Sequence, residues 1–425
     1  MANDGTPSRG LRVAIVGGGL GGLCAAGFLH RAGARVTVFE QAPELSYVGA
    51  GINMGPNAAR ILRHLGVGDA LAAAGELVET GWEFRRWQDA SVLFSQPRDA
   101  VSLQRYGAHG YFIHRADLLN VLLSVVPGEI IELGRACTGV EQDDGVARLS
   151  FADGSTAEAD VVIGADGINS VVRDAVVDDA APTTFSGLCA WRCLVPAQQA
   201  PLFALRPAQT LWVGPGRHVA HYPIRGRTWV NAVAITPAEA WNPQTWVAAG
   251  QINDLVAEFD GWDSRLTDLL SAATTATRWP LLERDPLPHW SRGRIALLGD
   301  SAHPMFPFLA QGAGQAFEDA ACLSACLADT NTNTTTNPNT NTNTDADADA
   351  DRAGVAEALQ RYQLLRAARA TEVQRRSREA SDREHLPDGP QQQLRDAQLS
   401  LQDPAEYNSW LYDHDALAHA ARAHR

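Results

Sequence analysis

The sequence predicts an α/β protein in which a domain built on a parallel sheet is joined to a smaller domain with a mixed or antiparallel sheet. Three observations predict this fold class. A β-branched strand pattern near the start runs into glycines and an alanine-rich helical pattern. Strands and turns dominate from about residue 185 to 236, and a buried-strand pattern returns at 294–298. Strand–helix–strand order is typical of parallel sheets, whereas strands joined by short glycine turns are typical of antiparallel ones.

The beginning of the chain forms one β-α-β unit. Leu11–Val16 and Arg35–Phe39 have strand patterns, and the segment between them is helical to about Ala32. The second strand ends at Glu40. Parallel strands connected through a helix place their carboxyl ends at one edge of a sheet, which is where ligands bind in such folds.

Gly17, Gly19 and Gly22 occupy the turn between the first strand and the helix in the order G-x-G-x-x-G. The first glycine permits a sharp turn, the second a close approach of pyrophosphate, and the third close packing of helix on strand. The helix N-terminus offers N–H donors to phosphate, and Glu40 is placed to accept hydrogen bonds from ribose hydroxyls. These residues predict a dinucleotide site without choosing between FAD and NAD.

Two further motifs each follow a predicted strand. A hairpin of 147–151 and 157–163 leads into Gly164-Ala165-Asp166-Gly167, and the strand at 294–298 leads into Gly299-Asp300. Asp166 has an alternative interpretation as a turn residue that caps its own backbone. The two motifs and the glycine turn together indicate that one dinucleotide is bound at three points.

The middle of the chain predicts an antiparallel meander of strands at 210–213, 217–224 and 228–235. Alternation along the second strand puts His218 and Tyr222 on one face and His221 on the other.

Composition excludes several classes of protein. The chain has 425 residues and a net charge of −14, which argues against nucleic-acid binding. It has neither a secretion signal at its start nor a run of about 18 apolar residues that could span a membrane. The six cysteines form no CxxC pair, so we expect reduced thiols, a cytoplasmic protein and no metal centre.

The last quarter of the chain predicts three segments. Residues 329–351 repeat Thr-Asn and then Asp-Ala and are expected to form a disordered loop, and 355–383 reads as a long charged helix. Tyr407, Trp410 and Tyr412 predict that residues 386–425 pack on the body of the protein.

The residues around the last motif resemble a known family. Arg294-Ile-Ala-Leu-Leu-Gly-Asp-Ser-Ala-His-Pro, followed by Phe306-Pro-Phe-Leu-Ala-Gln-Gly-Ala-Gly, is similar to the class A flavoprotein aromatic hydroxylases, in particular the salicylate-hydroxylase-like branch. That family carries all three motifs in this order. The resemblance implies a FAD-binding, Rossmann-like domain of the glutathione-reductase type at 11–181 and 287–385. It also implies a substrate-binding sheet domain at 182–286.

The resemblance also implies which residues bind FAD. Asp300 would bind the ribityl chain, Glu40 the adenosine ribose, and Asp166 belongs to a motif shared with NAD(P)H. Arg115 would lie near the flavin, or alternatively pair with Asp117 at a helix start. The full set of expected cofactor-binding residues is Gly17, Gly19, Leu20, Gly22, Glu40, Gln41, Gly51, Arg115, Asp166, Asp300, Pro307, Gln311, Gly312 and Ala313.

On the substrate side, the resemblance implies that His218 and Tyr222 are catalytic and help to deprotonate a substrate hydroxyl. The alternatives are a sheet histidine held by structural hydrogen bonds and an ordinary core tyrosine. His303 is interpreted as structural, and Arg192 is a candidate for binding a substrate carboxylate.

The implied activity is hydroxylation of a small phenolic or hydroxypyridine carboxylate, with or without decarboxylation, by NADH or NADPH and O₂ through a flavin C4a-hydroperoxide. The protein would be a monomer or homodimer. Two alternatives stay open. One is a monooxygenase or epoxidase acting on a larger natural product, although the Trp-x-Trp-x-x-Pro signature of halogenases is missing. The other is a non-catalytic flavin-binding protein.

Overall fold

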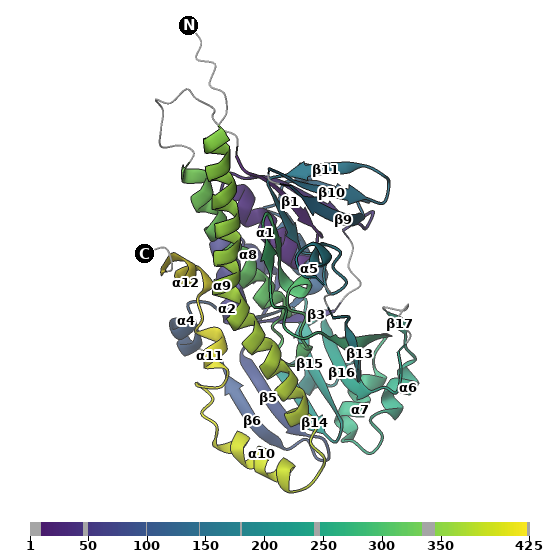
Figure 1. Ribbon diagram of the computed structural model, residues 1–425. Helices are drawn as coiled ribbons and strands as arrows, with labels where there is room; N and C mark the ends of the chain where they lie inside the picture. Colours follow the sequence, from purple (N-terminus) through teal and green to yellow (C-terminus); the bar gives the residue numbers. More distant parts are fainter. Residues whose placement is uncertain are drawn as a thin grey trace.

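The computed structural model describes residues 10–45, 50–98, 100–143, 145–178, 181–241, 247–333 and 345–422, without the side chains of 100–102, 329–333 and 345–353. The described chain forms two sheet-based parts, and a long helix, α9, runs beside both of them (Figure 1). The predicted α/β class is confirmed.

The first part is built on a six-stranded sheet of order β19-β20-β12-β1-β2-β8. All neighbours pair in parallel except β19, which is antiparallel to β20. The strands are β1 (Arg12–Val16), β2 (Arg35–Glu40), β8 (Ile131–Leu133), β12 (Val161–Gly164), β19 (Ser291–Arg292) and β20 (Ile295–Leu297). The three predicted motif strands are therefore neighbours, in the order β20-β12-β1.

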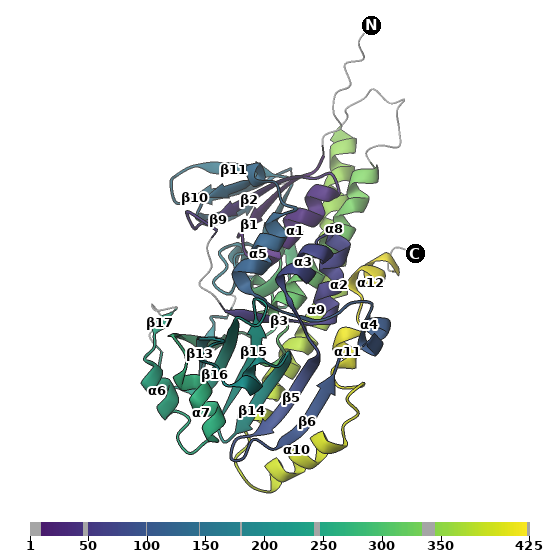
Figure 2. The same ribbon diagram turned by 180° about the vertical axis from the view of Figure 1, so that it is seen from behind.

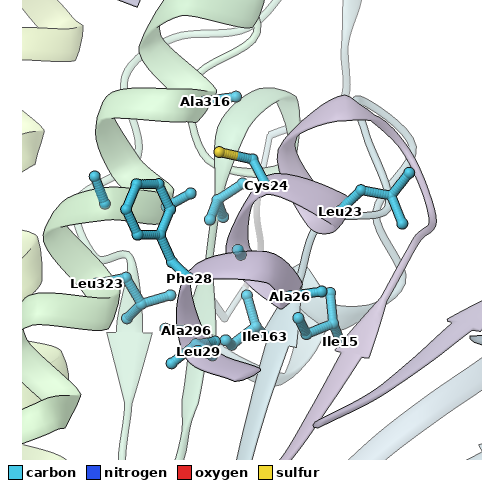
Figure 3. Close-up of a cluster of buried hydrophobic side chains, with 14 of the residues drawn as sticks. Ile15, Leu23, Cys24, Ala26, Phe28, Leu29, Ile163, Ala296, Ala316 and Leu323 are labelled. Atoms are coloured by element: carbon cyan, nitrogen blue, oxygen red, sulfur yellow. The ribbon is translucent and has the colours of Figure 1, made fainter. Parts of the chain in front are cut away.

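Helices α1 (Leu20–Arg31) and α8 (Gly312–Asn333) cover one face of this sheet (Figure 2). Figure 3 shows Cys24 and Phe28 of α1 beside Ala316 and Leu323 of α8, above Ile163 of β12. These side chains belong to one buried apolar cluster. The small residues of α1 allow the two helices to pack closely on the strands.

The hairpin expected at 147–163 forms, but its second strand divides between two sheets. β11 (Thr156–Ala159) pairs with β10 (Ala147–Phe151), which pairs with β9 (Cys137–Gln142), and the chain then enters the parallel sheet as β12. Asp160 lies at the division, where its carboxylate accepts from the backbone N–H of Arg12 at 2.8 Å.

The second part is an eight-stranded sheet of order β17-β18-β13-β16-β15-β14-β5-β6, which we call the large sheet. Its strands are β5 (Thr80–Arg86), β6 (Val92–Pro97), β13 (Thr184–Pro196), β14 (Ala208–Gly214), β15 (Arg217–Ile224), β16 (Trp229–Pro237), β17 (Ala248–Ala249) and β18 (Thr275–Glu283). The predicted meander is β14-β15-β16, paired antiparallel throughout.

The large sheet differs from the predicted boundaries of 182–286. β5 and β6 come from the segment that we assigned to the FAD-binding domain, and β5 pairs in parallel with β14. A parallel pairing between segments more than 100 residues apart leaves no local pattern in a sequence. The first segment of the FAD-binding domain is therefore interrupted by two strands of the other sheet.

The remaining elements connect and cover these sheets. A three-stranded sheet comprises β3 (Gly51–Met54), β7 (Tyr111–His114) and β4 (Glu76–Leu77). The other helices are α2 (Pro56–Leu65), α3 (Gly68–Ala74), α4 (Ala100–Tyr106), α5 (Arg115–Leu123), α6 (Ile252–Ala257), α7 (Ser264–Ser271), α10 (Pro390–Leu401), α11 (Ser409–Tyr412) and α12 (Ala416–Arg422). Short 3₁₀ helices are η1 (Gly128–Ile130), η2 (Val172–Ala175), η3 (Leu202–Leu205), η4 (Gly299–Ser301) and η5 (Pro307–Leu309).

The prediction of a loop at 329–351 is wrong for residues 329–333 and 345–351, which are helical. α8 continues to Asn333, and α9 (Asp345–Glu384) already includes the Asp-Ala repeats. Alanine has the highest helix propensity and aspartate is favoured in a first turn, so this segment can extend a neighbouring helix. Residues 334–344 lie outside the described residues.

Aromatic residues near the C-terminus contact the body of the protein. Tyr407 and Tyr412 are buried, and the Trp82 indole N–H donates to the Tyr412 hydroxyl at 3.1 Å. All six cysteines are free thiols. Over the described ranges, no helix combines the length and apolar character needed to cross a bilayer.

Candidate active site

The three sequence motifs meet at one edge of the parallel sheet. β12 lies between β1 and β20, with Gly164 opposite Val16 on one side and opposite Leu297 on the other. Each motif follows directly on the carboxyl end of its strand. The Leu298 N–H donates to Gly164 O at 2.9 Å and the Ser301 hydroxyl donates to the same oxygen at 2.6 Å, which joins the second and third motifs.

The glycine turn leaves no space for side chains. Gly17 has a φ of +107°, and a Cβ there would lie 2.4 Å from Ala165 O. A Cβ on Gly22 would lie 2.0 Å from Gly17 O. Gly19 is the residue before α1 and Leu20 is its first residue, so the N–H groups of the first turn are available to an anion at this edge.

Glu40 ends β2 beside this turn. Its carboxylate accepts from the backbone N–H groups of Gly18 at 2.7 Å and Ala42 at 2.9 Å. These bonds fix the carboxylate next to the glycine turn, where ribose hydroxyls can use its other lone pairs. Gln41 follows as an exposed residue.

Asp300 is exposed in η4 at the carboxyl end of β20. Protein surrounds it on enough sides that desolvation raises the pKa of its carboxyl, while His303 and Arg115 act in the opposite direction. A Cβ on Gly312 would lie 4.0 Å from Asp300 Oδ1, so this carboxylate and the N-terminus of the 22-residue α8 border the same space.

Arg115 begins α5 on the opposite side of this space. Its N–H donates to Ala50 O at 2.9 Å, which fixes the start of the helix to the loop before β3. Asp117, the alternative partner in the sequence, pairs with the Arg225 guanidinium at 2.8 Å. Arg115 also lies near Asp300 and Arg192: its charge offsets part of the rise that burial causes in the pKa of Asp300, and it adds to the lowering of the pKa of Arg192 by burial.

A network of buried polar side chains holds the Gly299-Asp300 turn in place. The Asp319 carboxylate of α8 accepts from Gly299 N–H at 3.0 Å, from Arg366 Nε at 2.8 Å, and contacts His303 Nε2 at 2.5 Å. Burial raises the pKa of Asp319, but His303 and Arg366 lower it by more, so the carboxylate is ionised. His303 is therefore structural, as expected.

The network extends to the start of α8. Glu318 accepts from Arg366 at 2.7 Å and from Asn57 at 2.7 Å, and Asn57 also donates to the buried Gln311 at 3.0 Å. Gln311 precedes Gly312, so these bonds fix the first residues of α8. Sequence reasoning missed Asp319, Glu318 and Arg366 because a charged residue in a helical pattern is usually solvated.

The segment before α8 has a strained backbone. Pro307 is exposed and begins η5, and Ala310 ends it in the left-handed region with a φ of +51°. Such a conformation costs a non-glycine residue about 1–3 kcal/mol and is frequent in binding sites. Gly312 and Ala313 follow as the first residues of α8.

Asp166 has the structural role that the sequence left open. Its Oδ2 accepts from Val171 N–H at 2.8 Å and Val172 N–H at 3.2 Å. Burial raises the pKa of its carboxyl. Asp166 thus caps η2 behind the glycine turn, at the same sheet edge.

One face of the large sheet borders the edge of the parallel sheet at which the three motifs meet. Gly51 N–H donates to Asn231 Oδ1 at 2.7 Å, and a Cβ on Gly51 would lie 2.8 Å from the Tyr222 ring. Tyr222 is buried and stacks on Phe112 with ring centroids 4.7 Å apart. Burial raises the pKa of Tyr222 and Arg192 lowers it, so Tyr222 is protonated at neutral pH. Residues 46–49, which precede Ala50 and Gly51, lie outside the described residues.

His218 lies on the same strand face but has its own partners. Its Nδ1 is 2.8 Å from His385 Nε2 and 3.4 Å from Glu384 Oε2, both at the end of α9. Its ring contacts Phe308 edge-on at 5.2 Å. Burial lowers the pKa of His218 well below its usual value. These contacts are those of a buried sheet histidine, and neither Glu384 nor His385 was identified from the sequence.

The described residues include no group of three histidine, cysteine, aspartate or glutamate side chains arranged to hold a metal ion.

The geometry fits FAD. A glycine turn without room for side chains opens α1, Glu40 flanks it, and Asp300 and the α8 N-terminus border a second space at the same sheet edge. These features are those of a flavoprotein.

Comparison with known proteins gives the family. The chain belongs to the FAD binding domain family, which matches residues 10–361. It is 41% identical to the 3-amino-4-hydroxybenzoate 2-monooxygenase of Streptomyces cremeus, over 96% of each chain. It is 39% identical to the 6-hydroxynicotinate 3-monooxygenase of Pseudomonas fluorescens, over 76% of this chain and 84% of that one. A solved structure of a salicylate hydroxylase substrate complex has a TM-score of 0.79 and 28% identity, covering 98% of both chains.

The first prediction concerns Asp300. We expect Asp300→Ala to weaken FAD binding about 10- to 100-fold, because hydrogen bonds to a charged group contribute about 1.5–3 kcal/mol. The ratio of flavin to protein absorbance after purification measures this, with Asp268→Ala on exposed α7 as the control. Full FAD occupancy in Asp300→Ala would contradict the assignment.

A second prediction concerns Glu384, which is buried and whose pKa burial raises to about 8. Between its unfolded pKa near 4.5 and 8, the folded state keeps a proton that the unfolded state has lost. Stability therefore falls as pH rises through this window. In Glu384→Gln this loss disappears, so its advantage over wild type grows by at most about 3 kcal/mol between pH ~5.5 and ~8.

Urea unfolding at several pH values measures this difference. Glu379→Gln, on the exposed side of the same helix, is the matched control. An advantage of Glu384→Gln that stays constant with pH would contradict the raised pKa.

Proposed function

We propose that this enzyme hydroxylates a small aromatic hydroxy acid and that 3-amino-4-hydroxybenzoate is the first compound to test as its substrate. The observation that carries the proposal is the large-sheet face beside the FAD site, where Tyr222, Asn231 and His218 lie next to Gly51 and Phe308. Similarity to the amino-hydroxybenzoate enzyme of Streptomyces cremeus covers 96% of the chain, which supports this compound over the others.

The expected FAD contacts form the second part of the proposal. The glycine turn of Gly17, Gly19, Leu20 and Gly22 holds the pyrophosphate and Glu40 with Gln41 the adenosine ribose. Asp300 binds the ribityl hydroxyls, Arg115 and Gly51 lie beside the flavin, and Asp166 supports the turn. Pro307, Gln311, Gly312 and Ala313 place the N-terminus of α8 at the flavin, where its positive end favours the reduced, anionic ring.

Bound FAD supplies the redox chemistry, taking electrons from NADH or NADPH and activating O₂. The protein's part is to position the ring and assist proton transfer. Tyr222 is protonated, so it acts as a hydrogen-bond donor that stabilises negative charge on a substrate oxygen. His218 is neutral and engaged with His385, so its proposed role is to position the substrate rather than to accept a proton.

Neutral side chains also suit an amino-substituted ring. Carbon 2 of 3-amino-4-hydroxybenzoate adjoins the carbon that bears the amino group, and the amine lone pair activates it only while the amine is unprotonated. A large-sheet face on which Tyr222 and His218 are both neutral at pH 7 provides no proton to the amine.

We further propose a cytoplasmic enzyme that is a monomer or a homodimer. The six free cysteines support a reducing compartment.

The test is a panel of aromatic acids assayed with purified, FAD-loaded enzyme. The panel comprises 3-amino-4-hydroxybenzoate, 6-hydroxynicotinate, salicylate and 3-hydroxybenzoate, each with NADH and with NADPH. We expect 3-amino-4-hydroxybenzoate to stimulate nucleotide oxidation and to gain one oxygen atom by mass spectrometry. Nucleotide oxidation without an oxygenated product from any acid would refute the proposed substrate class.

The role of Tyr222 gives a separate prediction. We expect Tyr222→Phe to slow oxygen transfer to the substrate about 10- to 100-fold, because a hydrogen bond to a charged oxygen contributes about 1.5–3 kcal/mol. Reduction of the flavin without substrate should be nearly unchanged. Stopped-flow absorbance separates the two steps, and equal slowing of both would contradict the role of Tyr222 as a hydrogen-bond donor to the substrate.

A further inference from the structure

Arg192 lies on the face of the large sheet that borders the FAD site. Arg192 of β13 lies opposite Val233 of β16, which lies opposite Ala220 of β15. Tyr222 is two residues further along β15, so alternation places Arg192 and Tyr222 on the same face. One strand, β16, lies between β13 and β15, so the two backbones are roughly 10 Å apart.

Arg192 lacks the partners that a buried arginine usually has. Among the residues that the structure describes, neither a carboxylate nor a carbonyl accepts a hydrogen bond from its guanidinium, which instead lies over the Trp279 ring, 4.6 Å from the centroid. Arg366 is a direct contrast, because its guanidinium is bound by both Glu318 and Asp319. A cation withdrawn from water without an anion destabilises the fold.

The surroundings of Arg192 increase this cost. Burial, together with the nearby Arg115, lowers the pKa of Arg192 to about 10, so the side chain is still charged at neutral pH. The side chain is half-buried, and Tyr222 lies near enough to raise the pKa of Arg192 in opposition to burial. Arg115 lies near Arg192, and Arg192 has no carboxylate partner among the described residues. This concentration of positive charge indicates a site for an anion.

We propose that Arg192 binds the carboxylate of the aromatic substrate, with the ring over Val233 and Ala220 and its polar substituents toward Tyr222. The proposal rests on the function proposed above and names the group that recognises the acid. Arginine suits a carboxylate because its planar fork donates two parallel hydrogen bonds. The FAD pyrophosphate is a less suitable anion, because the N-terminus of α1 already serves it on the other sheet.

The chain provides a matched control. Arg278 of β18 lies over Trp191, 4.7 Å from that ring centroid, and is paired across the sheet with Trp191, whereas Arg192 is paired with Thr277. Arg278 and Arg192 therefore make the same kind of cation–π contact on opposite faces of one sheet.

The experiment compares a ligand pair on four proteins: wild type, Arg192→Gln, Arg192→Lys and Arg278→Gln. The ligands are 3-amino-4-hydroxybenzoate and its neutral carboxamide, and Kd is measured on the oxidised, FAD-loaded enzyme from the change in flavin absorbance. We expect Arg192→Gln to weaken binding of the acid about 10- to 100-fold and to change binding of the amide less than about threefold. Arg192→Lys should recover part of the loss, and Arg278→Gln should match wild type.

The melting temperature of the ligand-free enzyme separates recognition from structural support. Removing an unpaired charge should leave the melting temperature of Arg192→Gln unchanged or raise it. A lower melting temperature together with equal weakening of acid and amide would overturn the role of Arg192 and leave the proposed function standing. Failure of wild type to bind any acid of the panel would overturn both.

Discussion

The Asp319 carboxylate is the contact on which the site depends most. It is fully buried, and it binds the backbone of the Gly299-Asp300 turn, the His303 ring and the Arg366 guanidinium together. These three groups come from the end of the parallel sheet and from α9, and Asp319 itself comes from α8. A single carboxylate therefore fixes the relative positions of a strand end, a turn and two helices. The buried Asp319 in this way positions the exposed Asp300.

Burying the charged groups of this network costs free energy, and the opposite charges within the network offset that cost. Burial alone would neutralise Glu318 and Asp319, and it is Arg366 and Arg369 with His303 that keep both carboxylates charged. Removing one member would leave an unpaired buried charge, which is costlier than never burying the pair. Arg192 on the large sheet is the opposite case, a charged group whose partner the fold does not supply. Arg366 has a structural role, and the role proposed for Arg192 is to bind a ligand.

The sequence predicted the parallel sheet and its three motifs because each motif is local. A strand, a glycine turn and a helix occupy about ten consecutive residues, and the physical reasons for Gly17 and Gly22 apply within that window. The interruption of the first domain by β5 and β6 could not be predicted, since the pairing of β5 with β14 joins distant segments. The same holds for the partners of His218, because Glu384 and His385 approach it from the far end of α9. Asn231, which accepts from Gly51, likewise has no signal in the sequence.

The length of α9 has a consequence for how this fold can change. Near its middle, Tyr362 donates to Leu297 O at 2.9 Å at the end of the parallel sheet, and just beyond its last residue His385 O accepts from Gly216 N–H at 3.0 Å in the large sheet. Between these points, the Ser377 hydroxyl donates to Phe306 O at 2.6 Å. The contacts of α9 with both sheets therefore fix the distance between them (Figure 1). One residue inserted between Tyr362 and Glu384 would shift the far contacts by about 1.5 Å and turn them by about 100°. Substitutions on the exposed side of α9 leave these contacts in place, whereas an insertion or deletion between them does not.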